Sequence, residues 1–271
     1  MNATDAQAWM EAGFLAVEGA MATELATARR LSITEDYIRA AMLRGLLMSR
    51  HASKGLVLRE FTPRWANAVC WNNAAHTQRQ GRRPQHDIAV VPLAQPNALD
   101  PEIICEVKWI KAGQANALHV AKDVWKSALT LNTARPGAAC RAFLLIGGED
   151  TALSSVLDAL RASGVAMRWS PAGRPATRPA KPNVRLGTFY DSTLGHDAIR
   201  SVLKWGQTPQ HHRAPPAVWW HLWAKDRVVW YRTNDEGVKW RIALWELHHR
   251  DVPDTDEFDW PGCKPHFTFA C

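Results

Sequence analysis

The chain has 271 residues, of which 46% are hydrophobic and 22% are charged. This length and balance supply enough apolar surface for a buried core, and they argue against a chain that is disordered throughout. The formal net charge of +7 and the pI near 9.4 favour a polyanionic partner such as nucleic acid.

Five scattered cysteines form no C-x-x-C pair, which is typical of thiols in a reducing cytosol. The first residues lack the basic segment of a signal peptide. No run approaches the ~20 apolar residues that span a bilayer. We therefore expect a cytoplasmic protein that does not associate with membranes.

Two helices are predicted before the first strand. Residues 4–29 are rich in Ala, Met, Leu and Glu, which favour helix. A second helix is predicted to run to about Ser49. Ser32 is its predicted N-cap, and Glu35 completes the capping-box pattern S-x-x-E.

From residue 55 onward, short apolar segments alternate with turns and helical patterns. The turn residues of "AQPNALDP" separate two strand-like segments, which are expected to pair as a hairpin. The resulting order α-β-β-β-α-β predicts an α/β fold with a mixed sheet flanked by helices. The predicted elements are strands at 55–61, 86–93 and 102–110, a helix at 116–132, a strand at 140–148, a helix at 154–164 and a strand at 165–170.

The C-terminal part differs in composition. Residues 171–185 are basic and rich in proline, which predicts either a stiff linker or a basic arm. Residues 186–271 form a Trp-rich region with a predicted three-stranded antiparallel meander, and eight of the fourteen tryptophans lie between Trp205 and Trp260. These tryptophans favour a core, or an interface with a second copy or a partner protein. Residues 1–170 are predicted to form the first domain.

Glu106 and Lys108 lie two residues apart on a predicted strand and therefore share a face, while Val107 points to the core. Taken alone, the pair fits the solvent face of a sheet. The predicted hairpin, however, brings Asp87 close to Glu106. Two carboxylates and a lysine in a basic protein suit a hard cation that faces a phosphate chain.

Asp87, followed by Glu106-Val107-Lys108 in the next strand, resembles the PD-(D/E)XK phosphodiesterase superfamily over roughly residues 32–148. The resemblance implies a restriction-endonuclease-like fold and a Mg²⁺-dependent deoxyribonuclease, with Mn²⁺ as a substitute, acting in restriction, phage defence or repair. It implies that Asp87, Glu106 and the Val107 carbonyl hold the metal. Lys108 would orient the attacking water or help to deprotonate it. The chain departs from the pattern at His86, where the superfamily often has proline.

Members of this superfamily often add an acid from the helix before the first strand. Glu35 is the candidate here, because it projects from an otherwise apolar helix face. The alternative is that Glu35 only completes the capping box. Glu60, in the first predicted strand, is a second candidate for the same place.

The helix after the third strand often contributes a Gln or Lys, for which Gln114, Lys122 and Lys126 qualify by position. Lys122 is taken as a candidate for DNA binding, against the alternative of a solvated helix face. Arg82 and Arg83 precede the second strand and could clamp a phosphate backbone, or form an ordinary solvated turn.

Two other functional hypotheses remain open at this point. The fold could be a catalytically inactive relative of nucleases that serves as a DNA-binding or structural subunit. The Trp-rich region could instead be the functional part and bind protein or peptide.

Overall fold

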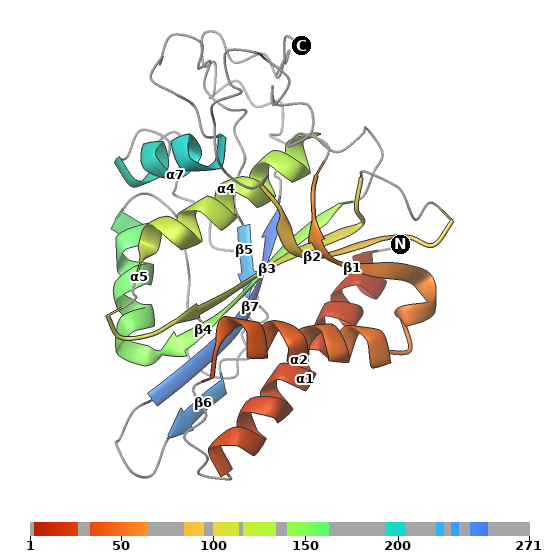
Figure 1. The fold of residues 1–271 in the computed structure, drawn as a ribbon, viewed down its shortest axis with the longest axis horizontal. Helices are drawn as coiled ribbons and strands as arrows, with labels where there is room; N and C mark the ends of the chain where they lie inside the picture. The colour runs from red at the N-terminus through yellow and green to blue at the C-terminus, as the bar shows by residue number, and fades with distance from the viewer. Residues whose placement is uncertain are drawn as a thin grey trace, which may run out of the picture.

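The computed structural model describes residues 3–26, 33–63, 84–94, 100–113, 116–133, 140–162, 193–203, 221–224, 229–232 and 239–248. Within these ranges the chain forms a seven-stranded mixed sheet with helices on both faces, which confirms the predicted α/β class (Figure 1). None of the described helices is long and apolar enough to cross a bilayer. The elements are α1 (Ala3–Ala26), α2 (Glu35–Met48), the 3-10 helix η1 (Ala52–Lys54), β1 (Gly55–Phe61), β2 (His86–Pro92), β3 (Ile103–Ile110), α4 (Ala117–Thr133), β4 (Arg141–Glu149), α5 (Asp150–Ala162), α7 (Thr193–Leu203), β5 (His221–Ala224), β6 (Val229–Arg232) and β7 (Lys239–His248).

The strand order in the sheet is β1-β2-β3-β4-β7-β5, with β6 also paired to β7. The predicted hairpin is confirmed, because β2 and β3 pair antiparallel with Ile88 opposite Cys105. Strands β3 and β4 are parallel, as expected for two strands joined by the crossover helix α4. Three antiparallel strands followed by a parallel fourth are thus as the sequence pattern predicts.

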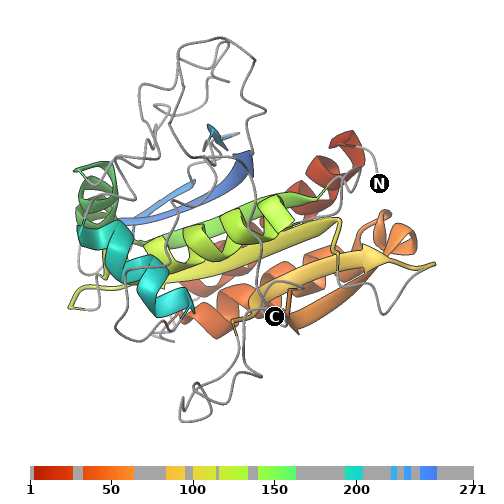
Figure 2. The same ribbon diagram turned by 90° about the horizontal axis from the view of Figure 1, so that it is seen from above.

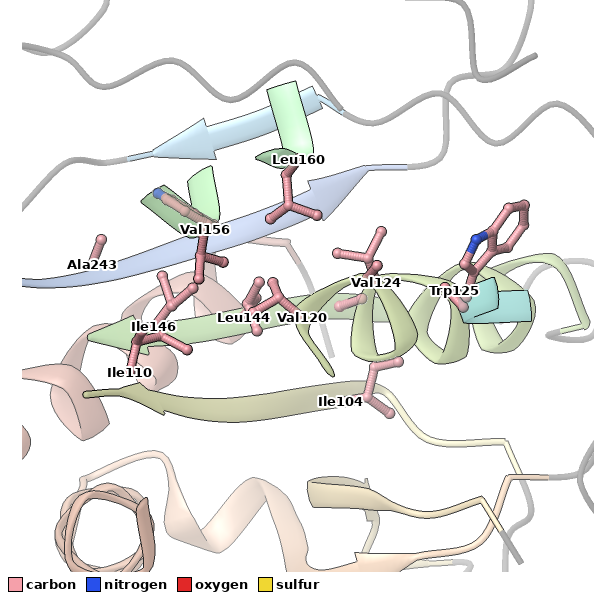
Figure 3. Close-up of a cluster of buried hydrophobic side chains, with 14 of the residues drawn as sticks. Ile104, Ile110, Val120, Val124, Trp125, Leu144, Ile146, Val156, Leu160 and Ala243 are labelled. Atoms are coloured by element: carbon pink, nitrogen blue, oxygen red, sulfur yellow. The ribbon is translucent and has the colours of Figure 1, made fainter. Parts of the chain in front are cut away.

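Helices cover both faces of the sheet (Figure 2). Buried apolar side chains form a cluster on each face. The face covered by α4, α5 and α7 carries Ile104 and Ile110 of β3, and Figure 3 shows this cluster. The opposite face, covered by α1 and α2, carries Cys105 and Val107. The two sets alternate along β3, as side chains of an extended strand must. Because both faces are buried, the strand reads as a nearly continuous apolar run.

Helix α2 begins later than the capping box predicts. Its N-cap is Thr34, whose side chain accepts a hydrogen bond of 3.1 Å from the Tyr37 amide. The prediction of Ser32 as N-cap is therefore wrong. Glu35 is the first residue of the helix rather than its third. Because a capping-box acid must stand at the third position, Glu35 is free of that role.

The C-terminal strands extend the same sheet. Strand β7 pairs along β4, with Leu144 opposite Trp245. The predicted three-stranded meander is confirmed in its second pair, β6 with β7, but wrong in its first, because β5 pairs with β7 and not with β6. Both strands pair antiparallel with β7, one toward each end of its ten residues. The linker at 171–185 and the strand predicted at 165–170 lie outside the described residues.

Gly148 of β4 is a position where only glycine fits. Its φ of +148° lies in a region that other residues rarely adopt. A Cβ placed there would lie 1.9 Å from the carbonyl oxygen of Ile110. We expect Gly148→Ala to lower the free energy of unfolding by about 2 kcal/mol or more, as measured by chemical denaturation. An unchanged denaturation midpoint would contradict this reading of the β3–β4 contact.

Candidate functional site

Polar side chains gather at one end of the sheet. Strand β3 continues from Glu106 to Ile110 beyond its pairing with β2, which ends at Cys105 opposite Ile88. Side chains from α2, β2 and α4 meet those of β3 at this end. We call this group the charged cluster, and its members are Glu35, Asp36, Arg39, Asp87, Glu106, Lys108, Asp123 and Lys126.

Lys108 connects the helices of the two layers. Its Nζ lies 3.2 Å from Glu35 Oε1 on α2 and 3.2 Å from Asp123 Oδ2 on α4. The side chain is 18% exposed. Burial alone lowers the pKa of Lys108, but Asp123 and Glu35 outweigh it and raise the pKa above its ordinary value. Lys108 is therefore a permanent ammonium near neutral pH.

Glu106 is buried beneath α4, with only 1% of its surface exposed. The interpretation of Glu106 as part of a solvent face is therefore wrong. Its Oε2 accepts a hydrogen bond of 2.9 Å from Lys126 Nζ, and its Oε1 lies 2.5 Å from His86 Nδ1. Burial raises the pKa of Glu106 well above its ordinary value and lowers that of His86 well below.

The His86–Glu106 pair shares one proton. The Thr130 hydroxyl donates to the Lys126 carbonyl oxygen, so in the 2.7 Å contact with Thr130 the donor must be His86 Nε2. In a neutral imidazole Nδ1 is then a bare acceptor, and Glu106 Oε1 must supply the hydrogen. An imidazolium beside a carboxylate would hold the same number of protons. Because the pKa of Glu106 is raised and that of His86 is lowered, the proton belongs on Glu106 and the pair is neutral.

This shared proton predicts a pH dependence of stability. The ordinary pKa values of Glu106 and His86 are 4.5 and 6.5. Above pH 6.5 the unfolded chain holds no proton on either group, whereas the folded pair holds one. The free energy of unfolding should therefore fall by about 1.4 kcal/mol per pH unit above 6.5, until the folded pair loses its proton. Between pH 4.5 and 6.5 both states hold one proton, so the pair contributes no slope.

Chemical denaturation at several pH values from 6.5 to 8.5 measures this slope. The Glu106→Gln variant is the matched control, because glutamine has the shape of a protonated glutamate and does not titrate. We expect the variant to lack the slope that the pair contributes. Parallel pH profiles for the variant and the wild type would overturn the assignment of the shared proton.

Asp87 faces α2 rather than Glu106. Its Oδ1 accepts a 2.9 Å bond from Arg39 Nη1, and its Oδ2 accepts a 2.8 Å bond from the Val107 amide. Arg39 also binds Asp36. The structure thus brings Asp87 next to the Glu106–Val107 backbone, as the hairpin predicts. The two side chains nevertheless point to different helix layers, Asp87 to Arg39 on α2 and Glu106 to Lys126 on α4.

Glu60 explains why the two acids diverge. It stands opposite Asp87, between the pairs Arg59–Ile88 and Phe61–His86, and its φ is +55°. Regular alternation would place Phe61 on the face opposite to Leu58, yet both lie on the α4 side. The interruption at Glu60 therefore coincides with a reversal of the phase of both strands, without an extra residue on either strand. His86 turns to Thr130 of α4, and Asp87 turns to Arg39 of α2.

Asp36, Arg39 and Asp123 escaped prediction as site members, whereas Lys126 qualified by position but was not chosen. Asp123 and Lys126 are paired at 2.8 Å, three residues apart on α4. Their spacing signals a shared helix face, but it cannot distinguish a buried face from a solvated one. Lys126 is only 16% exposed. Arg39 of α2 carried no signal in the sequence, since arginine is common on exposed helix faces.

The other predicted residues fall into two groups. Lys122 is half-buried on α4, one turn before Lys126, and takes no part in the charged cluster. Arg82, Arg83 and Gln114 lie outside the described residues. Their predicted contacts with DNA or with the site stay predictions.

The donor chemistry of the charged cluster suits a hard divalent cation, although its present geometry does not enclose one. In the described part of the chain, no three His, Cys, Asp or Glu side chains are spaced to hold a metal. Five carboxylates oppose three cations, and the shared proton with His86 leaves the cluster at a net charge of −1. Each carboxylate has about four acceptor positions, so Asp87 and Glu106 retain lone pairs beyond the two contacts described for each.

A comparison of this chain with family models, curated proteins and solved structures finds no match.

Proposed function

We propose that the protein is a Mg²⁺-dependent nuclease that hydrolyses DNA phosphodiester bonds. One observation carries this proposal: acids from α2, β2 and β3 gather with Lys108 at a single end of the sheet. The order α2-β1-β2-β3-α4-β4, with β3 parallel to β4, agrees with the restriction-endonuclease-like order that the sequence resembles. The net charge of +7 supports a polyanionic substrate.

Asp87, Glu106 and the Val107 carbonyl are the proposed ligands of the metal, and Glu35 is the proposed additional acid. When bound, Mg²⁺ supplies an activated water and neutralises negative charge that develops on the phosphate. The Val107 amide holds Asp87 in place through its 2.8 Å hydrogen bond. Glu106 must give up the proton that it shares with His86 before it can act as an anionic ligand.

Lys108 acts as a cation rather than as a base in this proposal. A protonated amine has no lone pair, and Asp123 and Glu35 hold Lys108 in that form by raising its pKa. Its N–H groups can donate to the attacking water or to a phosphate oxygen, which orients the reactants and balances the developing charge. Of the two roles that the resemblance implies, the charged environment favours orientation over deprotonation.

The second candidate is a DNA-binding or structural subunit without catalysis. The observation that favours it is that each acid already has a partner: Glu106 has Lys126, Asp87 has Arg39, and Glu35 has Lys108. A cluster that is satisfied in this way can stabilise the fold without a metal.

A cleavage assay separates the two candidates. The full chain is incubated with supercoiled plasmid, linear duplex and single-stranded DNA in Mg²⁺, in Mn²⁺ or in excess chelator. We expect cleavage that depends on the metal and is lost in Asp87→Asn, a variant that keeps the size of the side chain. Binding of DNA in chelator, with no cleavage in either metal, would select the non-catalytic candidate. Cleavage that survives in Asp87→Asn would rule out the proposed metal ligands.

A further inference from the structure

Lys126 has the environment of a bound metal ion. Its Nζ lies 2.8 Å from Asp123 Oδ1, 2.9 Å from Glu106 Oε2 and 2.9 Å from the carbonyl oxygen of Gln85. An ammonium has three N–H donors, and these three oxygens account for all of them. The Asp123 carboxylate, the Glu106 carboxyl group and a main-chain carbonyl form a hard-oxygen set of the kind that Mg²⁺, Mn²⁺ and Ca²⁺ take once Glu106 gives up its proton.

The site around this ammonium is built into the fold. Asp123 and Glu106 are both buried, and they come from α4 and β3, on either side of the ammonium. Both oxygens of the Asp123 carboxylate face an ammonium, since Oδ1 lies 2.8 Å from Lys126 Nζ and Oδ2 lies 3.2 Å from Lys108 Nζ. A buried carboxylate depends on such cationic partners, because an unpaired charge in the protein interior is costly.

Charge balance explains why a cation must be present there. Burial alone would raise the pKa of Asp123, yet Lys126 and Lys108 lower it below its ordinary value. Asp123 is therefore an anion in the protein interior and needs a positive partner. A lysine tethered to α4 supplies that partner at any concentration of metal.

We propose that the Lys126 ammonium is a resident cation that closes a three-oxygen site between Glu106 and Asp123 to metal ions, and that removing it opens a divalent-cation site at the same place. This inference deepens the proposed function, and the number of metal ions that it predicts for the native chain rests on that function. A catalytic metal would bind on the Asp87 side of Glu106, so that each native chain would take one ion there rather than two.

The test compares the number of bound Mn²⁺ ions per chain in wild type and Lys126→Met. Methionine has a similar length and no charge. The number bound is measured by titrating the protein while the electron paramagnetic resonance signal of free Mn²⁺ is recorded. We expect Lys126→Met to bind one more ion than the wild type. The extra ion should be absent from the double variant Lys126→Met/Asp123→Asn and from Lys122→Met, which removes a lysine one turn earlier on α4.

Equal numbers for the wild type and folded Lys126→Met would overturn the inference. If Lys126→Met does not fold by itself, its refolding with and without Mn²⁺ is compared by circular dichroism. Recovery only with the metal supports the resident cation, and equal failure in both conditions overturns it. This result can be distinguished from the test of the proposed nuclease. If the wild type binds no Mn²⁺ and cuts no DNA while Lys126→Met binds one ion, the resident cation is supported and the nuclease function is rejected.

Discussion

Glu106→Ala is expected to lower the free energy of unfolding by about 3–5 kcal/mol, whereas Glu106→Gln should retain most of the native stability near pH 7. Alanine removes a buried group that meets Lys126 at 2.9 Å and His86 at 2.5 Å. Lys126 then keeps only one carboxylate, and His86 Nδ1 is buried without a partner. Glutamine can still donate to His86 and accept from Lys126, because its amide matches the protonated acid in shape.

Urea denaturation of the two variants beside the wild type measures this difference. It also decides how the nuclease proposal can be tested, since a lost activity in Glu106→Ala would report unfolding as readily as a lost ligand. Glu106→Gln removes the anionic ligand with the fold intact. Equal stability of the alanine variant and the wild type would mean that the buried contacts of Glu106 add nothing to the fold.

Lys108→Met is expected to slow the proposed DNA cleavage by about two to four orders of magnitude. The reason is that the Lys108 ammonium lies 3.2 Å from Glu35, the proposed additional acid, and stands two residues after the proposed metal ligand Glu106 on β3. Because Lys108 stays protonated, Lys108→Arg should retain more of the rate than Lys108→Met. Arginine keeps the charge but cannot serve as a base.

Initial rates of plasmid cleavage under saturating Mg²⁺ measure this effect, with thermal unfolding curves to verify that each variant is folded. Lys54→Met is the control, because Lys54 is exposed on η1 and pairs with Asp5, which lies outside the charged cluster. A Lys108→Arg variant as slow as Lys108→Met would instead favour proton transfer by Lys108. A Lys108→Met variant as fast as the wild type would remove Lys108 from the chemistry.

The sequence was sufficient for the elements from α1 to α5 and for the neighbourhood of the site. Periodicity and turn residues predict β2, β3 and their hairpin, because local patterns reflect which face of a strand is buried. The hairpin alone places Asp87 beside the Glu106–Val107 backbone, where the structure has it. The expectation that Glu35 belongs with Lys108 rested on the resemblance, and the structure places the two at 3.2 Å.

The sequence was insufficient for the contacts within the site. Alternation predicts that Asp87 and Glu106 share a face, but the left-handed backbone at Glu60 reverses the phase of β1 and β2 at this point. No local pattern foretells such an interruption, because glutamate has no preference for positive φ.

Only the tertiary structure decided which cation meets each acid. Asp123 and Lys126 look like a solvated helix face in the sequence, since spacing along α4 does not say what covers it. Packing α4 against β3 buries both residues beside Glu106. The sequence by itself determined the order of the elements from α1 to α5, the hairpin and the residue types at the sheet end. The partners of Asp87, Glu106 and Lys108 depend on side chains far apart in the chain, and only the packing of the two helix layers brings these together.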